Sequence, residues 1–127
     1  MCTEFQEAVS YCLIRHRSII DVITKLQESN ARVSRAIAKS ITVCGCLKIN
    51  AEKQNIPQDA DLSELKKYMQ SHLKGELCRN CTETIEREIG TNIFYTTALC
   101  ELLGLDLNDI LTKEYNKITT LGIYNLS

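Results

Sequence analysis

Apolar residues recur every three to five positions along most of this chain, which is the spacing typical of amphipathic helices. The clearest pattern runs from residue 83 to residue 117 and predicts two helices joined by a short corner. Gly104 would end the first helix, because glycine adopts the left-handed conformation at little cost. Asp106 would then cap the second helix. We therefore expect an antiparallel helix pair against which the rest of the chain packs.

Two more helices are expected in the N-terminal half. The first covers about residues 3–15, with Thr3 as its cap and Gln6 completing a capping box. A longer apolar seam extends over 19–44, and Asn30 is its one polar member. A buried amide needs partners, so Asn30 would mark an interior hydrogen-bond site or the mouth of a cavity. The alternative is an edge position at the surface.

The middle of the chain is less regular. Gly45 weakens any helix that continues past residue 44, so a kink or a fresh start is expected there. Residues 55–60 form the clearest linker. Asp61 would then cap a short helix that ends at Gly75, with His72 in its last turn in a structural role.

Two segments beside these helices carry weaker signals. His16, in a basic joint before the long seam, is interpreted as a solvated loop residue. Near the C-terminus, Gly122 would end the last helix. Ile123, Tyr124 and Leu126 are apolar enough to dock on the bundle or on a partner chain.

A chain of 127 residues is long enough for one domain, covering 1–127, and too short for two. Its single proline and five glycines favour long helices over a turn-rich β fold. We predict an all-α fold of four to five helices in a bundle. Residues 19–44 and 82–103 would form its facing pair.

Charge and hydropathy limit the classes of partner that we expect. Fifteen basic residues nearly balance sixteen acidic ones, so electrostatics give no reason to expect nucleic acid or an anionic membrane. No run approaches the 18 apolar residues needed to span a bilayer, and the first residues do not read as a secretion signal. We expect a cytoplasmic protein whose seven cysteines are reduced.

Four of these cysteines form two close pairs, Cys44-Gly-Cys46 and Cys78-Arg-Asn-Cys81. Two pairs of thiolates suit a tetrahedral Zn²⁺ or a related soft metal. Residues two apart on a helix point in nearly opposite directions, so the first pair can share an ion only if Gly45 breaks the helix. In the alternative interpretation Cys12, Cys44 and Cys100 are small core residues, and Cys78 and Cys81 form a loop pair.

Residues 88–95 read Glu-Ile-Gly-Thr-Asn-Ile-Phe-Tyr, and residues 102–107 read Leu-Leu-Gly-Leu-Asp-Leu. This half of the chain resembles the C-terminal half of the all-α MazG-like nucleotide pyrophosphohydrolases. The resemblance implies a helical bundle that forms a homodimer or a dimer of dimers. It also implies Mg²⁺ held by carboxylates of two facing helices, and cleavage of nucleoside triphosphates to a monophosphate and pyrophosphate.

The acidic positions of that family are largely lost here. Laid on the long seam and on the later helix, its motifs keep only Glu28 and Glu88 as carboxylates. A metal site with so little charge would bind a nucleotide, or cleave it weakly, rather than turn it over efficiently. Three neutral residues are expected near the ligand: Asn30, Thr91 and Asn92. The resemblance places two lysines, Lys113 and Lys117, near the phosphates.

Two classes of function follow. In the first, the chain is a divergent MazG-like protein that binds or weakly hydrolyses nucleoside triphosphates. In the second, it is a non-catalytic helical module that a cysteine-bound metal or dimerisation stabilises, and that works through protein contacts.

Overall fold

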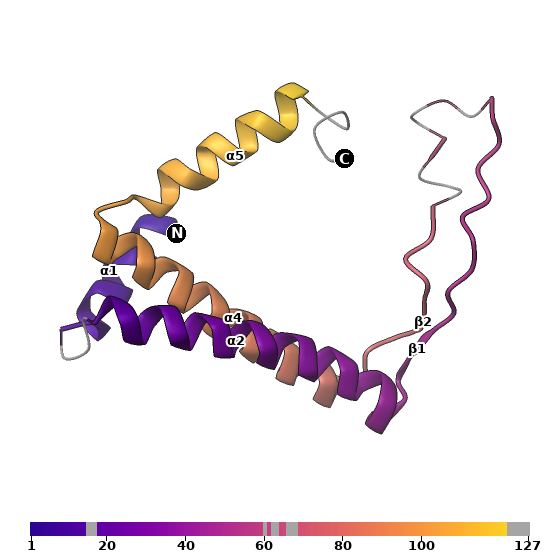
Figure 1. The fold of residues 1–127 in the computed structure, drawn as a ribbon, viewed down its shortest axis with the longest axis horizontal. Helices are drawn as coiled ribbons and strands as arrows, with labels where there is room; N and C mark the ends of the chain where they lie inside the picture. Colours follow the sequence, from indigo (N-terminus) through magenta and orange to yellow (C-terminus); the bar gives the residue numbers. More distant parts are fainter. Residues whose placement is uncertain (15–17, 60, 62–63, 66–68, 122–127) are drawn as a thin grey trace. The chain divides into compact units, whose positions relative to one another are not determined.

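The computed structural model describes residues 1–14, 18–59, 61, 64–65 and 69–121. These residues are mostly helical (Figure 1). The α-helices are α1 (Cys2–Cys12), α2 (Ile19–Lys39), α4 (Arg79–Leu103) and α5 (Leu107–Leu121). A π-helical turn, η1 (Ser40–Cys44), continues α2, and two short strands, β1 (Leu47–Ile49) and β2 (Leu73–Gly75), complete the set. The predicted helical character is confirmed, whereas the strands were not predicted.

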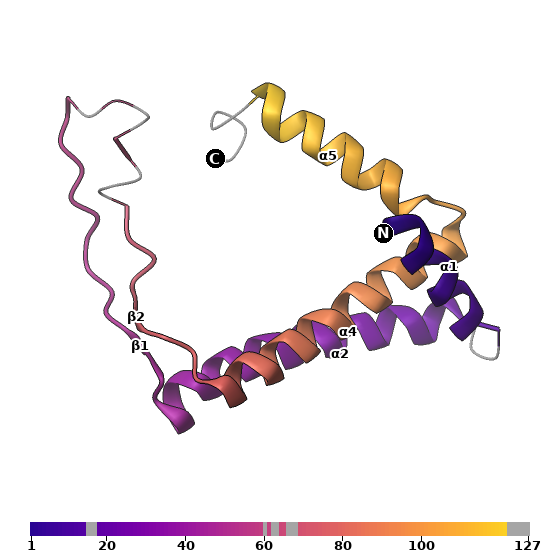
Figure 2. The same ribbon diagram turned by 180° about the vertical axis from the view of Figure 1, so that it is seen from behind.

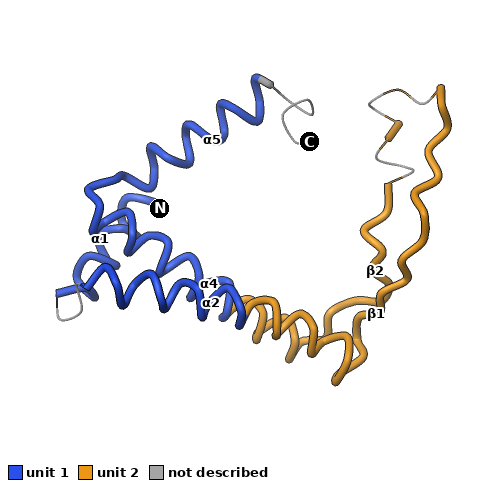
Figure 3. The backbone as a smooth tube through the Cα atoms, viewed as in Figure 1, with its two compact units in different colours: residues 1–32, 88–127 blue, residues 33–87 orange. Residues whose placement is uncertain are grey.

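The chain divides into two compact units (Figure 3). Unit 1 contains residues 1–32 and 88–127, and unit 2 contains residues 33–87. The single domain expected from the chain length stays a prediction.

The core of unit 1 draws residues from three helices and one turn. Its buried members are Val9 of α1, Leu13 just after α1, Val22 of α2 and Ala98 of α4. Several partly buried side chains pack against them: Phe5, Phe94, Tyr95, Leu99 and Leu102. Within this unit α2 and α4 lie side by side in both views (Figures 1 and 2). The predicted pairing of these two helices is seen here.

The corner between α4 and α5 follows the sequence prediction. Gly104 has a φ of 71°, the left-handed conformation that ends α4. Asp106 Oδ1 accepts the backbone N–H of Asp109 at 3.2 Å, as an N-cap does. The turn chemistry at this site is local, which is why the sequence predicts it.

The capping box expected at the first helix is wrong. α1 begins at Cys2, and its N-cap residue Met1 makes no side-chain cap bond. The Gln6 side chain instead reaches the corner after α4, where it donates to Glu101 and to the backbone oxygen of Leu105 and accepts the N–H of Leu107. Partners far away in the sequence outcompete the local cap.

The predicted break at Gly45 is confirmed. Gly45 has a φ of 78° and donates its N–H to the oxygen of Ser40 at 3.0 Å, which closes the π-helical turn. Ser40 is fully buried, and its hydroxyl donates to the oxygen of Ile37 at 2.6 Å. The seam predicted over 19–44 thus ends as α2 followed by η1.

The helix predicted from Asp61 to Gly75 is wrong at its C-terminal end. Residues 73–75 form β2, which pairs antiparallel with β1 in the register Leu47 with Gly75 and Ile49 with Leu73. The cap bond itself exists, because Asp61 Oδ1 accepts the N–H of Glu64 at 2.9 Å.

His72 is also not in a helix. It has a φ of 63° and comes just before β2. Its Nε2 lies 2.8 Å from the oxygen of Glu52 and 3.2 Å from Gln54 Nε2, which gives it a structural role. Leu73 pairs with Ile49 of β1, and this pairing between distant residues overrides the local helical spacing.

Some expectations fall on residues that are not described. His16 and the apolar C-terminal residues Ile123, Tyr124 and Leu126 lie outside the described part of the chain. Within the described part, none of the helices combines the length and the apolar character that a membrane crossing requires.

Candidate metal centre

The four paired cysteines meet at one place in unit 2, where η1 ends and where β1 and α4 begin. Cys44 is the last residue of η1, and Cys46 immediately precedes β1. Cys78 immediately precedes α4, and Cys81 lies in the first turn of α4. The left-handed Gly45 turns the chain between the first two cysteines, so both can face the same point.

The spacing of the sulfurs suits one metal ion. All four Sγ atoms lie within 4.8 Å of one another, and those of Cys44 and Cys78 are 3.7 Å apart. A tetrahedral Zn²⁺ with Zn–S bonds of about 2.3 Å separates its sulfurs by about 3.8 Å. A cluster of several irons would spread the thiolates further, because they bind different iron atoms. Among the described residues this is the one group of three or more cysteine, histidine or acidic side chains placed to share an ion.

The thiols of this cluster differ in acidity. The backbone N–H of Cys81 donates to the sulfur of Cys78 at 3.4 Å. This bond, together with the thiols of Cys81 and Cys44, lowers the pKa of Cys78 to about 7. The Cys81 thiol donates to Cys78 and is removed from water, and both effects raise the pKa of Cys81 to about 12. The pKa of Cys44 is also raised, by its contacts with the Cys78 and Cys46 thiols, so the Cys78 sulfur takes up negative charge before those of Cys44 and Cys81, at the positive end of α4.

Gly75 supports the cluster from the end of β2. Its φ is 84°, and a Cβ at this position would collide with the backbone oxygen of Cys46. The close approach of the two strands next to Cys46 therefore requires glycine. This role of Gly75 was not predicted. Its one signal in the sequence is that a glycine lies close to each cysteine pair, Gly45 in the first and Gly75 just before the second.

A cleft gives access to part of the cluster. It has a volume of about 210 Å³ and lies between the end of α2 with η1 and the start of α4. Cys44 and Cys81 are among the residues that line it, together with Ser40, Val43, Asn80 and Thr84. Cys81 is 9% exposed and Cys44 is exposed, so solvent reaches the cluster mainly from the Cys44 side.

The alternative interpretation of the cysteines as core residues holds only for one of them. Cys100 is buried in α4, where burial raises the pKa of its thiol. Cys12 and Cys44 are exposed, so they do not fill the core.

The carboxylates predicted as remnants of a Mg²⁺ site lie in unit 1. Glu28 is exposed on α2, where it pairs with Arg32 at 3.2 Å and with Lys25 at 3.6 Å. Glu88 is half-buried on α4. Neither belongs to a group of three or more clustered ligands among the described residues.

The neutral positions of that predicted site are partly brought together. Asn92 donates its side-chain amide to the Asn30 side-chain oxygen, which links α4 to α2. Asn30 is exposed, so the edge position was the better of the two interpretations. Thr91 is half-buried beside this contact. Lys113 and Lys117 are exposed on α5, where Lys117 pairs with Glu114 at 3.8 Å.

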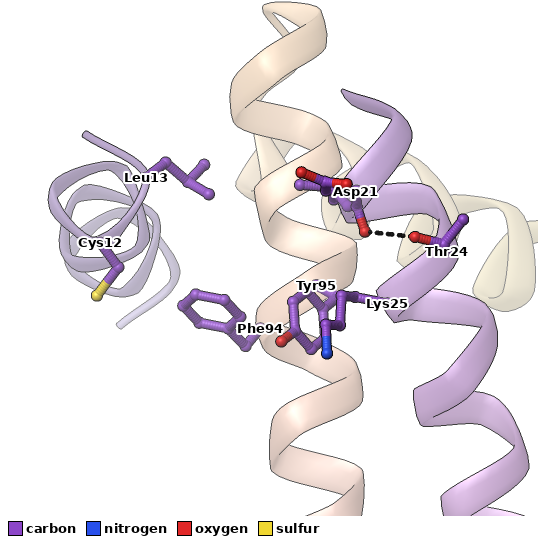
Figure 4. A pocket seen from close by; sticks show the side chains of 8 residues that line it. Cys12, Leu13, Asp21, Thr24, Lys25, Phe94 and Tyr95 are labelled. Carbon is purple, nitrogen blue, oxygen red and sulfur yellow. Dashed lines mark hydrogen bonds between the residues drawn. The ribbon is translucent and has the colours of Figure 1, made fainter. Parts of the chain in front are cut away.

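Unit 1 also contains a larger cavity of about 430 Å³ (Figure 4). Phe94 and Tyr95 meet edge to face at its wall, with ring centroids 5.2 Å apart. Asp21 and Lys25 bring opposite charges to it from α2, and Cys12 lies on the α1 side.

Comparison with known proteins identifies no relative. No family model, no curated protein and no solved structure matches this chain.

Proposed function

We propose that this chain is a non-catalytic helical interaction module held together by one Zn²⁺ on Cys44, Cys46, Cys78 and Cys81. The convergence of the four sulfurs within 4.8 Å is the observation that carries the proposal. Four thiolates at this spacing are the usual ligands of a structural zinc site, which leaves no open position for a substrate.

Unit 2 has a small apolar core, so a bound metal would add stability that this core does not supply. The described apolar side chains buried in residues 33–87 are Leu47, Ile85 and Cys81. The sheet has two strands of three residues each, and such a hairpin is marginal by itself in water. A zinc ion would connect η1, β1 and α4, and its binding energy would become folding energy.

The proposed contacts with other proteins would use apolar surface on α5. Ile110, Leu111 and Ile118 recur at helical spacing and remain 40–47% exposed, and Tyr115 beside them is 67% exposed. A continuous apolar strip on an exposed helix is typical of a protein interface. The partner that we expect is a second copy of the chain, in line with the oligomer that the family resemblance implies.

Metal analysis of the protein purified without oxygen or chelators tests the metal site. We expect one zinc per chain. The variant Cys78→Ser should lose most of this zinc, whereas Cys12→Ser, which removes an exposed thiol outside the cluster, should keep it. A metal-free wild-type protein that remains folded would refute the proposal.

The second candidate function is nucleotide binding in unit 1, as the resemblance to MazG-like enzymes suggests. The Asn30–Asn92 hydrogen bond favours it, because it joins α2 and α4 close to the positions of Glu28 and Glu88. In this proposal the two glutamates hold a weakly bound Mg²⁺, and Thr91, Asn92, Lys113 and Lys117 contact the nucleotide. Any hydrolysis would release pyrophosphate.

Calorimetric titration with nucleoside triphosphates and Mg²⁺, combined with a pyrophosphate-release assay, tests this candidate. Turnover that Glu28→Gln and Glu88→Gln both abolish would support an enzyme. Heat of binding without turnover would support a nucleotide sensor. The exposed, unrelated variant Lys48→Gln serves as the matched control. No response to any nucleotide would refute nucleotide binding and leave the metal-stabilised module.

A further inference from the structure

We propose that Cys44 and Cys78 form a thiol–disulfide switch, in which oxidation by a hydroperoxide joins their sulfurs and expels the metal. The inference rests on the proposed zinc site and assigns it a regulation. It would make the fold of unit 2 depend on the redox state of its surroundings.

The distance between the two sulfurs is the first observation. Cys44 Sγ and Cys78 Sγ are 3.7 Å apart, and a disulfide bond is about 2.05 Å long. The sulfurs must therefore approach by less than 2 Å. Next to Cys44, no atom lies within 4 Å of the position that a Cβ would take at Gly45, so no neighbouring group packs against this side of the turn.

The second observation is the access to one of these sulfurs. Cys44 is exposed and lines the cleft between η1 and α4, which is wide enough for a small peroxide. Cys81 lines the same cleft but is 9% exposed. The Cys46 sulfur is half-buried and lies 3.7 Å from the oxygen of Ser40. An oxidant from solvent thus meets Cys44 first.

The third observation is the position of Cys78 beside Cys44. Cys78 lies before the first residue of α4, and its sulfur accepts the N–H of Cys81. This bond holds the sulfur in place toward the cluster. A thiolate in such a position attacks an oxidised neighbour faster than it meets a second oxidant.

The chemistry balances with hydrogen peroxide as the oxidant. The Cys44 sulfur, which is a thiolate when it holds the proposed zinc, attacks one peroxide oxygen, the O–O bond breaks, and a sulfenic acid and hydroxide result. The Cys78 thiolate then attacks the Cys44 sulfur, forms the S–S bond and displaces a second hydroxide. Each hydroxide takes one proton from solvent to give water, so two thiolates lose two electrons and the peroxide gains them.

Loss of two ligands should release the ion. Only Cys46 and Cys81 would remain, and two thiolates do not complete a tetrahedral zinc site. A thiol reductant would restore the four ligands, so the switch would be reversible as long as Cys44 has not gone beyond the sulfenic acid.

The experiment uses the full chain with the cysteines outside the cluster replaced, as Cys2→Ser, Cys12→Ser and Cys100→Ala. Zinc is counted first in the reduced protein, which tests the metal site alone. Hydrogen peroxide is then added in steps while a colorimetric chelator reports free zinc. We expect about one zinc released per peroxide consumed, and full rebinding after treatment with dithiothreitol.

Tryptic mapping identifies the disulfide. Trypsin leaves Cys44 and Cys46 together in peptide 40–48, places Cys78 in peptide 75–79 and Cys81 in peptide 80–87. We expect peptide 40–48 joined to peptide 75–79. Cys44→Ser should abolish this product, whereas Cys46→Ser, which also removes one ligand, should retain it.

The outcomes separate the two proposals. A reduced protein without zinc would refute both the metal site and the switch. Zinc that is present but stays bound under tenfold excess peroxide would refute the switch alone. A link to peptide 80–87, or oxidation without any link, would refute it as well.

Discussion

The sulfur of Cys78 accepts the backbone N–H of Cys81 at 3.4 Å, at the first turn of α4. A cysteine here occupies the place that serine or aspartate takes at other helix starts, and its charge meets the positive end of the helix dipole. The same contact that caps the helix also fixes the sulfur that we propose as a metal ligand.

The first prediction concerns the reactivity of this thiol. In metal-free reduced protein Cys78 should be half-ionised near pH 7, because its pKa is lowered to about 7, whereas a free cysteine has a pKa of about 8.5. Its alkylation rate should rise with pH and level off above about pH 8. Mass spectrometry of peptide 75–79 after timed iodoacetamide treatment measures this. A midpoint at pH 8.5 or above would contradict the capping role.

The second prediction concerns metal removal and pH. Zinc must displace the protons still held by the cluster, including that of Cys81, whose pKa is raised to about 12. Lower pH therefore favours the protonated thiols, and the apparent zinc affinity should fall about tenfold per pH unit for each displaced proton. Competition with a chromogenic chelator between pH 6 and pH 8 measures the slope. Stripping the metal should also lower the melting temperature, and a pH-independent affinity would argue against thiolate ligation.

The third prediction concerns Gly75. Gly75→Ala should weaken zinc binding and destabilise the sheet, because the new Cβ collides with the backbone oxygen of Cys46 at a left-handed position. Gly90→Ala is the matched control. Gly90 lies within α4 with nothing near its Cβ position, so this change should stabilise the protein by about 0.5–1 kcal/mol. Thermal unfolding and zinc content are measured for both variants. We expect a lower melting temperature and less zinc for Gly75→Ala, and a higher melting temperature for Gly90→Ala.

The fourth prediction concerns Gln6 in unit 1. Its side chain joins α1 to the α4–α5 corner through the oxygen of Leu105 and the N–H of Leu107, at 2.9 and 2.8 Å. Gln6→Ala should cost about 0.5–1.5 kcal/mol of folding free energy, because it removes the partly buried bond to the N–H of Leu107 and the exposed bond to the oxygen of Leu105. Denaturant unfolding measures this. Gln27→Ala, at an exposed position of α2, should change stability by less than about 0.5 kcal/mol, and equal effects would contradict the linking role.

The sequence predicts best those features that depend on neighbouring residues. Gly104 and Asp106 define the corner between α4 and α5 through their own backbone and side-chain preferences, and both were predicted. Gly45 was predicted to break the helix for the same reason. The four clustered cysteines were predicted from two short spacings and from the break at Gly45, which are all local features.

The features that the sequence did not predict depend on distant partners. Leu73 has helical spacing from Leu65 and Met69, yet it pairs with Ile49 in the sheet. Gln6 has the spacing of a capping box with Thr3, yet it binds the corner about 100 residues later. In both cases a local preference of a few tenths of a kcal/mol is smaller than the gain from the tertiary contact.

β1 and β2 both depart from the cysteine cluster, and Gln54 exchanges two hydrogen bonds with Gln70 farther along the arm between them. The arm between the strands therefore starts and ends at the same pair of strands, next to the cysteine cluster. Cys46 and Cys78 both lie outside this arm. We therefore expect a peptide grafted into this arm to leave the cysteine cluster in place, because both ends of the arm pass through the paired strands.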